Sequence, residues 1–358
     1  MSQTDTPLRF GICGLGFMGR TYFAHLHSHA RARVVAVCDR DAARRAGRWH
    51  ATGNIAAPQA NQSDLRGVRA YATPAELLRD PDVNAVAVTL PTPLHADTTA
   101  AALRAGKHVL CEKPMARDLA GCDRMIAAAE QARRTLMIAH CIRFWPQYET
   151  ISRLVADARI GAVRFAKLAR LASAPQYSEG NWLMDGAASG GALLDLHVHD
   201  VDFAQALLGV PQSARAHGRH GPSGQIDHVV ALYGYSDGRY AILEGGWTYH
   251  APWPFEMAIT VCGELGTLTW SSARGDRVCL YSGGEQPERI ECPSQTGWQR
   301  QLDYFIDCVT HGRPVERCPP ASSRTSLALA LLERESIDTG TEINVRSWLS
   351  ARLPSETA

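Results

Sequence analysis

The chain has 358 residues, of which 45% are hydrophobic and 20% are charged, and its formal net charge is +1. A chain of this size and composition can bury a large core, and it is expected to form two domains. A net charge this close to zero gives no electrostatic reason to expect nucleic acid or a membrane surface as partner, so we expect a small molecule. The opening MSQTDTPLRF lacks the pattern of a signal peptide, and no apolar run is long enough to span a bilayer. We therefore expect a soluble cytoplasmic protein.

The first predicted element is a strand over residues 8–13, which leads into a glycine-rich turn and a helix. Gly14, Gly16 and Gly19 have the GxGxxG spacing, and Phe17 and Met18 lie between the last two of them. In dinucleotide-binding proteins such glycines allow a tight turn, a close approach of the pyrophosphate and close packing of helix against strand. The helix N-terminus then attracts the phosphates. On its own, the spacing is also compatible with a glycine-rich turn that binds no ligand.

A second buried strand is predicted over residues 34–38, and Asp39 and Arg40 follow it. A carboxylate at this point, some twenty residues after the glycines, is typical of a group that binds the adenosine ribose. Its charge opposes the 2′-phosphate of NADP, whereas Arg40 could pair with that phosphate. Because the reach of Asp39 is short and fixed, we expect NAD as cofactor in preference to NADP.

Short strands and helices continue to alternate to about residue 141. Asp41 is expected to cap a helix that runs through Ala51, and Thr73 and Glu76 form a capping box. The remaining elements are strands over 85–90, 108–111 and 136–141 and helices ending near Gly106 and over 118–134. This alternation predicts a parallel, doubly wound Rossmann sheet in a first domain, residues 1–141, with ligands beyond the carboxyl ends of the strands. The loop after strand 85–90 adds further candidates for cofactor contact, namely Leu90, Pro91, Thr92 and His95, although His95 is also suited to starting the next helix.

The pattern changes from residue 163 onward, where β-rich runs are joined by turn signals. Ser236-Asp237-Gly238 is expected to close one hairpin, and Gly263-Glu264-Leu265 is expected to join another pair of strands. We therefore predict a second, α+β domain over residues 142–345 with a large, mainly antiparallel open sheet. Residues 346–358 are expected to be a C-terminal tail.

Two places carry candidate chemistry beyond the glycine turn. Glu112-Lys113-Pro114 follows the strand 108–111 and so is expected on the same sheet edge as the glycines. Residues 190–209 have helical periodicity, which puts Asp195 and His199 on one helix face. A carboxylate beside an imidazole orients it and suits it to act as a general base. The same spacing is equally explained if Asp195 and His199 are an ordinary pair on a helix surface. Lys113 is equally explained as a solvated loop lysine.

A metal site is not expected. Asp195, His197, His199 and Asp200 include ligand-type side chains, but on a helix His197 points roughly 200° away from Asp195. The ten cysteines contain no CxxC pair, and several lie in apolar runs. We expect them to be buried as small hydrophobic residues.

Five segments in order resemble the Gfo/Idh/MocA oxidoreductases, and the resemblance runs nearly end to end. They are GICGLGFMG, the EKP at 112–114, IRFWP at 142–146, ASGGALLDLHVHD at 188–200, and SLALALLE followed by a Thr-Gly turn. The resemblance implies a Rossmann domain, an α/β domain whose open sheet often mediates oligomerisation, and a Lys113-Pro114 bond that is frequently cis. A homodimer or homotetramer is the expected assembly.

In similar enzymes the EKP lysine and the aspartate and histidine of the D-x-x-x-H helix surround the reacting carbon, which implies Lys113, Asp195 and His199 as catalytic residues. The same resemblance makes Arg143 and Trp182 candidates for substrate binding and Glu112 and Lys113 candidates for cofactor binding. The sequence departs from many relatives at His197, where they have glycine.

The implied function is NAD(P)-dependent oxidation or reduction of a sugar, inositol or sugar derivative at a secondary alcohol. A glycosidase that uses bound NAD without net turnover and a non-catalytic dinucleotide-binding regulator are the alternatives.

Overall fold

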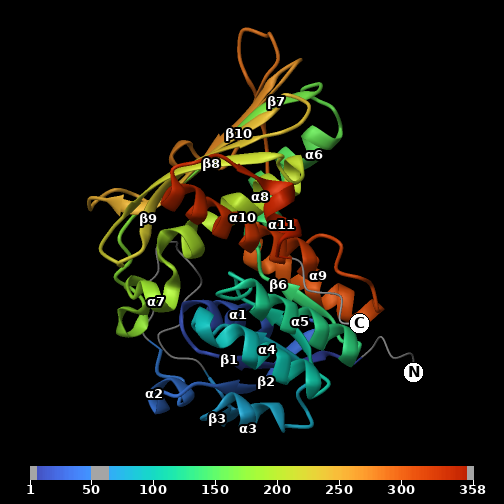
Figure 1. Ribbon diagram of the computed structural model, residues 1–358. Helices are drawn as coiled ribbons and strands as arrows, with labels where there is room; N and C mark the ends of the chain where they lie inside the picture. The colour runs from blue at the N-terminus through green and yellow to red at the C-terminus, as the bar shows by residue number, and fades with distance from the viewer. Residues whose placement is uncertain (1–5, 50–63, 353–358) are drawn as a thin grey trace. The chain divides into compact units, whose positions relative to one another are not determined.

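The computed structural model describes residues 6–49 and 64–352, and its contacts divide the chain into two units (Figure 1). The first unit consists of Met1–His140, Gln176–Trp182 and Trp298–Arg324, and the second of Cys141–Pro175, Leu183–Gly297 and Thr325–Ala358. The N-terminal segment of the first unit therefore ends at His140, next to the predicted domain boundary at residue 141. It also takes in two later segments that the predicted boundaries assign to the second domain.

The first unit is built on a six-stranded parallel sheet with the strand order β3-β2-β1-β4-β5-β6. This is the order of a doubly wound Rossmann sheet, in which ligands bind beyond the carboxyl ends of the strands near the β1 switch point. The central strands are almost completely buried, as their continuous apolar sequences predicted. The strands are β1 (Leu8–Cys13), β2 (Ala32–Cys38), β3 (Arg69–Tyr71), β4 (Ala85–Val88), β5 (His108–Cys111) and β6 (Leu136–Ile138).

The helices of this unit begin where the sequence places their caps. Asp118 accepts a hydrogen bond from Gly121 N at the start of α5, and Thr73 and Glu76 form the predicted capping box. From the later segments, α9 packs on β1 through the rings of Phe305 and Phe10, 6.0 Å apart. The helices are α1 (Phe17–His27), α2 (Ala42–Arg45), α3 (Pro74–Leu78), η1 (Thr92–Leu94), α4 (His95–Arg104), α5 (Leu119–Ala132) and α9 (Gly297–His311).

The predicted helix from Asp41 through Ala51 is shorter than expected. Asp41 does cap it, because its side chain accepts a hydrogen bond from Ala43 N, but α2 ends at Arg45. Gly47 has a φ of 78°, a left-handed conformation that ends the helix. Ala51 itself lies outside the described residues.

The second unit contains a nine-stranded sheet in the order β14-β13-β12-β11-β7-β10-β9-β8-β15. Neighbouring strands in this sheet are antiparallel, except that β7 and β10 are parallel to each other. The prediction of a large, mainly antiparallel sheet is confirmed. Both predicted hairpin turns join paired strands, β9 to β10 and β11 to β12. The strands are β7 (Val163–Ser173), β8 (Ser213–His220), β9 (Ile226–Gly234), β10 (Tyr240–Tyr249), β11 (Glu256–Gly263), β12 (Thr267–Ser271), β13 (Val278–Tyr281), β14 (Glu288–Ile290) and β15 (Ile343–Asn344).

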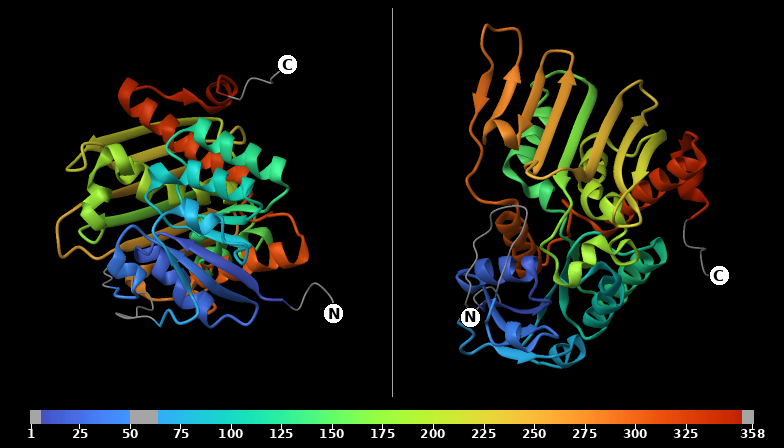
Figure 2. Two further views of the ribbon diagram at one scale, coloured as in Figure 1. Left: turned by 90° about the horizontal axis from the view of Figure 1, so that it is seen from below. Right: turned by 90° about the vertical axis from the view of Figure 1, so that its left-hand side faces the viewer.

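One face of this sheet packs against helices, and side chains alternate accordingly. Along β9, Val229, Ala231 and Tyr233 are buried, whereas Val230 and Leu232 are exposed. The right-hand view of Figure 2 shows the strands in front of the helices of this unit. The helical segments are η2 (Cys141–Phe144), α6 (Pro146–Ala156), α7 (Gly186–Ser189), η4 (Leu193–His197), α8 (Val198–Leu208), η5 (Ser272–Arg274) and α11 (Val345–Ser350); η3 (Glu179–Met184) and α10 (Pro320–Thr339) each span the two units.

The helix predicted over 190–209 is present from residue 191 to Leu208 and contains a π-helical turn. Gly190 and Gly191 have φ values of 86° and 71°, and a Cβ atom on Gly191 would lie 2.8 Å from the Ile226 carbonyl oxygen. The chain therefore turns between α7 and η4, a π-helical turn, before α8 begins at Val198. Helix α11 also occupies part of the segment that was expected to be a tail.

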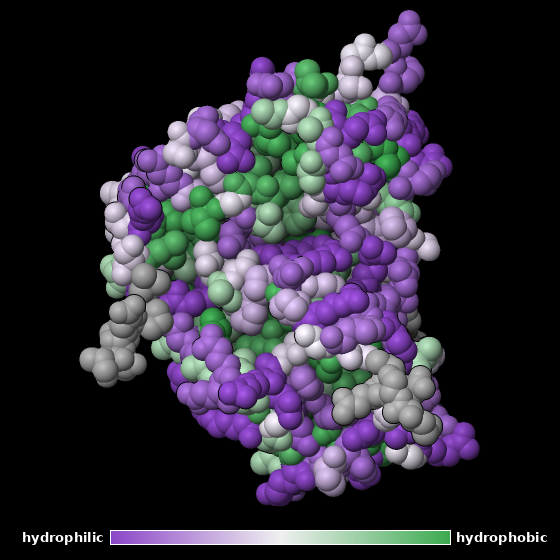
Figure 3. Space-filling model, turned by 90° about the vertical axis from the view of Figure 1, so that its right-hand side faces the viewer, coloured by the Kyte–Doolittle hydropathy of each residue, from purple (hydrophilic) through white to green (hydrophobic). Residues whose placement is uncertain are grey.

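The surface mixes polar and apolar side chains. On the face drawn in Figure 3, hydrophilic residues predominate and hydrophobic residues form separate patches. No helix among the described residues is long and apolar enough to cross a membrane.

Candidate functional site

The glycine turn between β1 and α1 has the geometry that the GxGxxG spacing predicts. Gly14 has a φ of 97°, and a Cβ atom there would lie 2.7 Å from the Thr89 carbonyl oxygen. A Cβ atom on Gly19 would lie 1.8 Å from the Gly14 carbonyl oxygen, so a side chain at either position would collide with backbone. Gly16 differs, because nothing lies within 4 Å of the place where its Cβ would be. The turn is thus closed on its inner side and open at Gly16, which fits the close approach of a pyrophosphate.

Thr89, the residue that follows β4, is hydrogen-bonded to this turn. The hydroxyl of Thr89 donates to the carbonyl oxygens of Cys13 and Gly14, at 3.0 and 2.7 Å. Residues Leu90, Pro91 and Thr92, predicted to contact the cofactor, continue from Thr89 at the carboxyl edge of the sheet.

His95 is buried at the start of α4 and connects two loops. Its ring nitrogens lie 2.9 Å from the carbonyl oxygen of Pro114 and 2.7 Å from that of Leu90. The side chain thus ties the loop after β4 to the loop that carries Lys113. His95 is the first residue of α4, as expected for a residue that starts a helix. Its ring contacts the backbone of the two loops that carry predicted cofactor residues.

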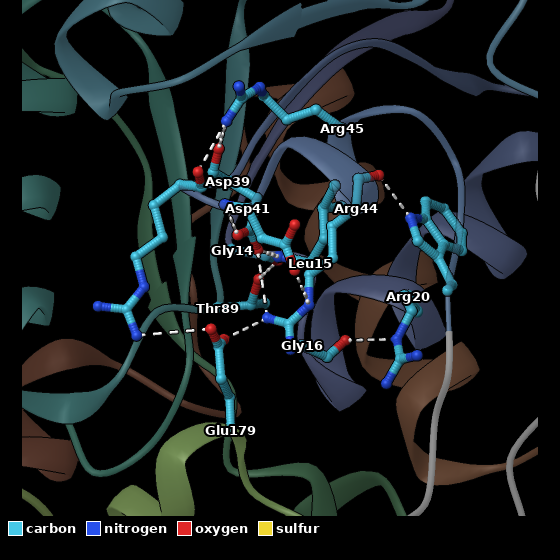
Figure 4. A network of polar contacts seen from close by, with 12 residues as sticks. Gly14, Leu15, Gly16, Arg20, Asp39, Asp41, Arg44, Arg45, Thr89 and Glu179 are labelled. Carbon is cyan, nitrogen blue, oxygen red and sulfur yellow. Dashed lines mark hydrogen bonds and ion pairs between the residues drawn. The ribbon is translucent and has the colours of Figure 1, made fainter.

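Asp39, at the end of β2, faces the glycine turn (Figure 4). One carboxylate oxygen accepts a hydrogen bond from Leu15 N at 2.7 Å, and the other accepts one from Asp41 N at 2.9 Å. The side chain is nearly buried, so its negative charge is held next to the turn by two backbone donors. Asp39 therefore both shapes the turn and supplies the carboxylate predicted for the adenosine ribose.

The arginine beside this carboxylate is Arg44, which the sequence analysis did not identify. Arg44 Nη1 lies 3.6 Å from Asp39 Oδ2 and is also paired with Glu179, whereas Arg40 is 83% exposed and reaches Glu179 at 3.5 Å. The only local signal for Arg44 is its place three residues after the cap Asp41. Glu179 has no local signal, because it is 135 residues away in the chain.

Glu112 and Lys113 follow β5 as expected, but the Glu112 carboxylate is directed into the unit. It accepts a hydrogen bond from the hydroxyl of Tyr22 on α1, which in turn accepts one from Gln301 Nε2 at 2.6 Å. Tyr22 and Gln301 were also missed. The peptide bond between Lys113 and Pro114 is cis, as the resemblance implied.

In the second unit, Asp195 and His199 are presented by η4 and the first turn of α8. Within residues 191–200 these two side chains are partly exposed, and the other eight residues are buried. Asp195 and His199 are therefore the two residues of 191–200 that reach the surface, and their role in a site stays a prediction.

His197, between them, points the other way and is completely buried. Its Nε2 lies 2.9 Å from the carboxylate of Glu333 on α10, which also accepts a hydrogen bond from the Tyr233 hydroxyl at 2.6 Å. Burial by itself lowers the pKa of His197, but the negative charge of Glu333 and its hydrogen bond raise the pKa above its ordinary value. On its other side the ring packs on Gly245, where a Cβ atom would lie 2.5 Å from Nδ1.

The two residues proposed for substrate binding lie in different units. Arg143, in the second unit, forms a bidentate pair with Asp202 at 2.6 and 2.7 Å, and Asp202 also accepts from the Ser326 hydroxyl. Trp182, in the first unit, is half-buried in η3.

The ligand-type side chains form no cluster. Among residues 6–49 and 64–352 there is no group of three or more His, Cys, Asp or Glu side chains that could hold a metal ion. All ten cysteines are free thiols, and seven of them are buried.

Comparison with known families covers both units. Residues 8–140 match the model described as "Oxidoreductase family, NAD-binding Rossmann fold", and residues 148–269 match the "GFO/IDH/MocA C-terminal domain".

Named relatives align over nearly the whole chain. The chain is 30% identical to trans-1,2-dihydrobenzene-1,2-diol dehydrogenase of Sus scrofa over 92% of its length and 93% of the relative. It is 27% identical to myo-inositol 2-dehydrogenase of Thermotoga maritima, over 91% and 93%. A solved levoglucosan dehydrogenase in complex with NADH and levoglucosan superposes with a TM-score of 0.80 at 20% identity, over 95% of this chain and all of the other. With family matches in both units and relatives aligned over nearly the whole chain, the chain belongs to the Gfo/Idh/MocA family of NAD-binding oxidoreductases.

Proposed function

We propose that the protein transfers a hydride between NAD and a secondary alcohol or ketone of a sugar, inositol or related cyclic polyol. The observation that carries the proposal is that, within residues 191–200, Asp195 and His199 alone are partly exposed while the other eight residues are buried. The names of the relatives support the substrate class, since inositol and a cyclic dihydrodiol both carry secondary hydroxyl groups.

The residues that would hold the cofactor fit it. The open position at Gly16 leaves space for the pyrophosphate, and Asp39 presents a carboxylate to the adenosine ribose. When bound, the nicotinamide supplies the hydride acceptor or donor.

The chain's own side chains then handle the proton and the charge. In the direction of oxidation, His199 Nδ1 or Nε2 takes the hydroxyl proton as the carbon loses its hydride, and Asp195 keeps the ring oriented. The ammonium group of Lys113 stabilises the developing alkoxide. In reduction the same groups act in reverse, with His199 donating the proton.

The direct test is to incubate the purified protein with NAD or NADP and a panel of sugars, inositols and cyclic diols while following reduced nicotinamide. We expect His199→Ala and Lys113→Ala each to lower kcat by about 10² or more, the effect of losing an acid-base group, while NAD affinity stays within a few-fold. His220→Ala, at an exposed strand position, serves as the control. Near-normal turnover of His199→Ala across the pH range would show that His199 is not the base.

The panel also separates the alternatives. Net NADH formation from a polyol excludes a redox-neutral glycosidase and a regulator without turnover. Cleavage of a glycoside with no net NADH would instead favour the glycosidase.

A further inference from the structure

The carboxylate of Glu179 holds two arginines at the edge of the predicted adenosine site (Figure 4). Glu179 begins η3 and belongs to the first unit, together with α2. Its Oε2 accepts a hydrogen bond from Arg44 Nη1, and its Oε1 lies 3.5 Å from Arg40 Nη2. Arg40 and Arg44 are thus both directed toward the same acidic residue.

Arg44 is surrounded by negative charge. Besides Glu179, its guanidinium lies 3.6 Å from Asp39 Oδ2 and 3.9 Å from Asp41 Oδ2. The Arg44 side chain is only 21% exposed, whereas that of Glu179 is 38% exposed. The guanidinium of Arg44, which lies beside the Asp39 carboxylate, is therefore already neutralised by protein carboxylates, and a phosphate would have to compete with Glu179 for it.

We propose that Glu179 is a specificity-determining residue that selects NAD by withholding Arg44 from the 2′-phosphate of NADP. The inference rests on the proposed function only in placing the adenosine ribose beside Asp39. Glu179 acts by satisfying the guanidinium of Arg44, which would otherwise pair with the phosphate. Asp39 discriminates by its contact with the ribose, and Glu179 discriminates by controlling the neighbouring cation.

Glu179→Gln tests this inference, because glutamine keeps the size of the side chain and removes its charge. The dissociation constants of NADH and NADPH are measured by fluorescence titration of the purified protein without any alcohol or ketone. We expect NADPH to bind about fivefold more tightly to the variant, the gain of one partly exposed ion pair, and NADH to change by less than about twofold.

Two further variants identify the cause. Glu130→Gln, at an exposed position of α5, changes the net charge equally and should leave both affinities unchanged. Adding Arg44→Gln to Glu179→Gln should abolish the gain for NADPH. An equal change for both dinucleotides, no change, or a gain that survives Arg44→Gln would each overturn the inference.

The same titration separates this inference from the proposed function. Selective binding without turnover of any polyol would count against the proposed reaction alone. If the unmodified protein bound neither dinucleotide, both would fail.

Discussion

At the scale of single residues, Asp39 has more than one task. Its two carboxylate oxygens accept hydrogen bonds from Leu15 N and Asp41 N, so the side chain supports the glycine turn before any ligand arrives. The same short, nearly buried side chain fixes a negative charge where the ribose 2′ position is proposed to lie. An arginine on a long and exposed side chain, such as Arg40, does not have this fixed position.

We therefore predict that NAD is preferred over NADP by about tenfold to a hundredfold in kcat/KM, or roughly 1.4 to 2.7 kcal/mol. Asp39→Ala should relax or invert the preference. It should also weaken binding of both cofactors, since two backbone N–H groups of the turn lose their acceptor. Steady-state kinetics with both cofactors check the preference, and equal values for the unmodified protein would contradict it.

At the scale of elements, three segments hold the π-helical turn that carries Asp195. From β10, Gly245 leaves room for the ring of His197, and from α10, Glu333 pairs with it. Tyr233 on β9 donates to the same carboxylate. A buried ion pair of this kind costs desolvation when it forms, but removing one partner leaves the other charge buried and uncompensated.

His197→Gln should lower the free energy of unfolding by about 3 kcal/mol at acidic pH. The pKa of His197 is raised in the folded protein, so the stabilisation by the protonated ring is complete below the unfolded-state pKa of about 6.5. It is lost as the pH rises through the folded-state pKa. Urea unfolding at a series of pH values should therefore show the largest difference between the unmodified protein and the variant at low pH.

His220→Gln, on the exposed part of β8, is the matched control and should leave the stability unchanged at every pH. A difference between the unmodified protein and His197→Gln that does not vary with pH would mean that the buried pair carries no titrating proton. Packing against Gly245 alone would then explain the loss.

At the scale of the whole molecule, the outer face of the nine-stranded sheet carries several exposed apolar side chains. Val230, Leu232 and Tyr240 are 38%, 48% and 39% exposed on neighbouring strands. The Phe165 and Tyr240 rings stack at 5.3 Å, and Leu232 is paired with Ile242 in the sheet register. Such a surface is rarely left in contact with water, so we propose that it mediates assembly into a dimer or tetramer.

Sedimentation at micromolar concentration should then show a dimer or tetramer, and Val230→Lys combined with Leu232→Lys should shift it to the monomer. Val210→Lys changes an apolar residue that is 47% exposed outside this sheet and should not affect assembly. A monomeric unmodified protein would contradict the prediction.

Much of the fold follows from the local sequence, because the turns and helix ends depend on interactions between residues that are close in the chain. The GxGxxG turn, the capping box at Thr73 and the hairpin at Ser236-Asp237-Gly238 each depend on the backbone preferences and short-range hydrogen bonds of a few adjacent residues. Alternating strands and helices likewise predict the parallel sheet, whose carboxyl edge positions Asp39 and Lys113. Spacing also predicts that Asp195 and His199 share a face while His197 does not.

The sequence alone therefore determined the two sheets and the glycine turn, and it is the source of the proposal that Lys113, Asp195 and His199 carry the chemistry. The tertiary structure decided which charges meet: Arg44 with Glu179, His197 with Glu333, and Arg143 with Asp202. These partners are far apart in the chain, and each pairing depends on how separate elements pack, which no local pattern encodes. The turn at Gly190 and Gly191, where this helix begins after α7, has the same origin, since the approach of the Ile226 backbone excludes a side chain at Gly191.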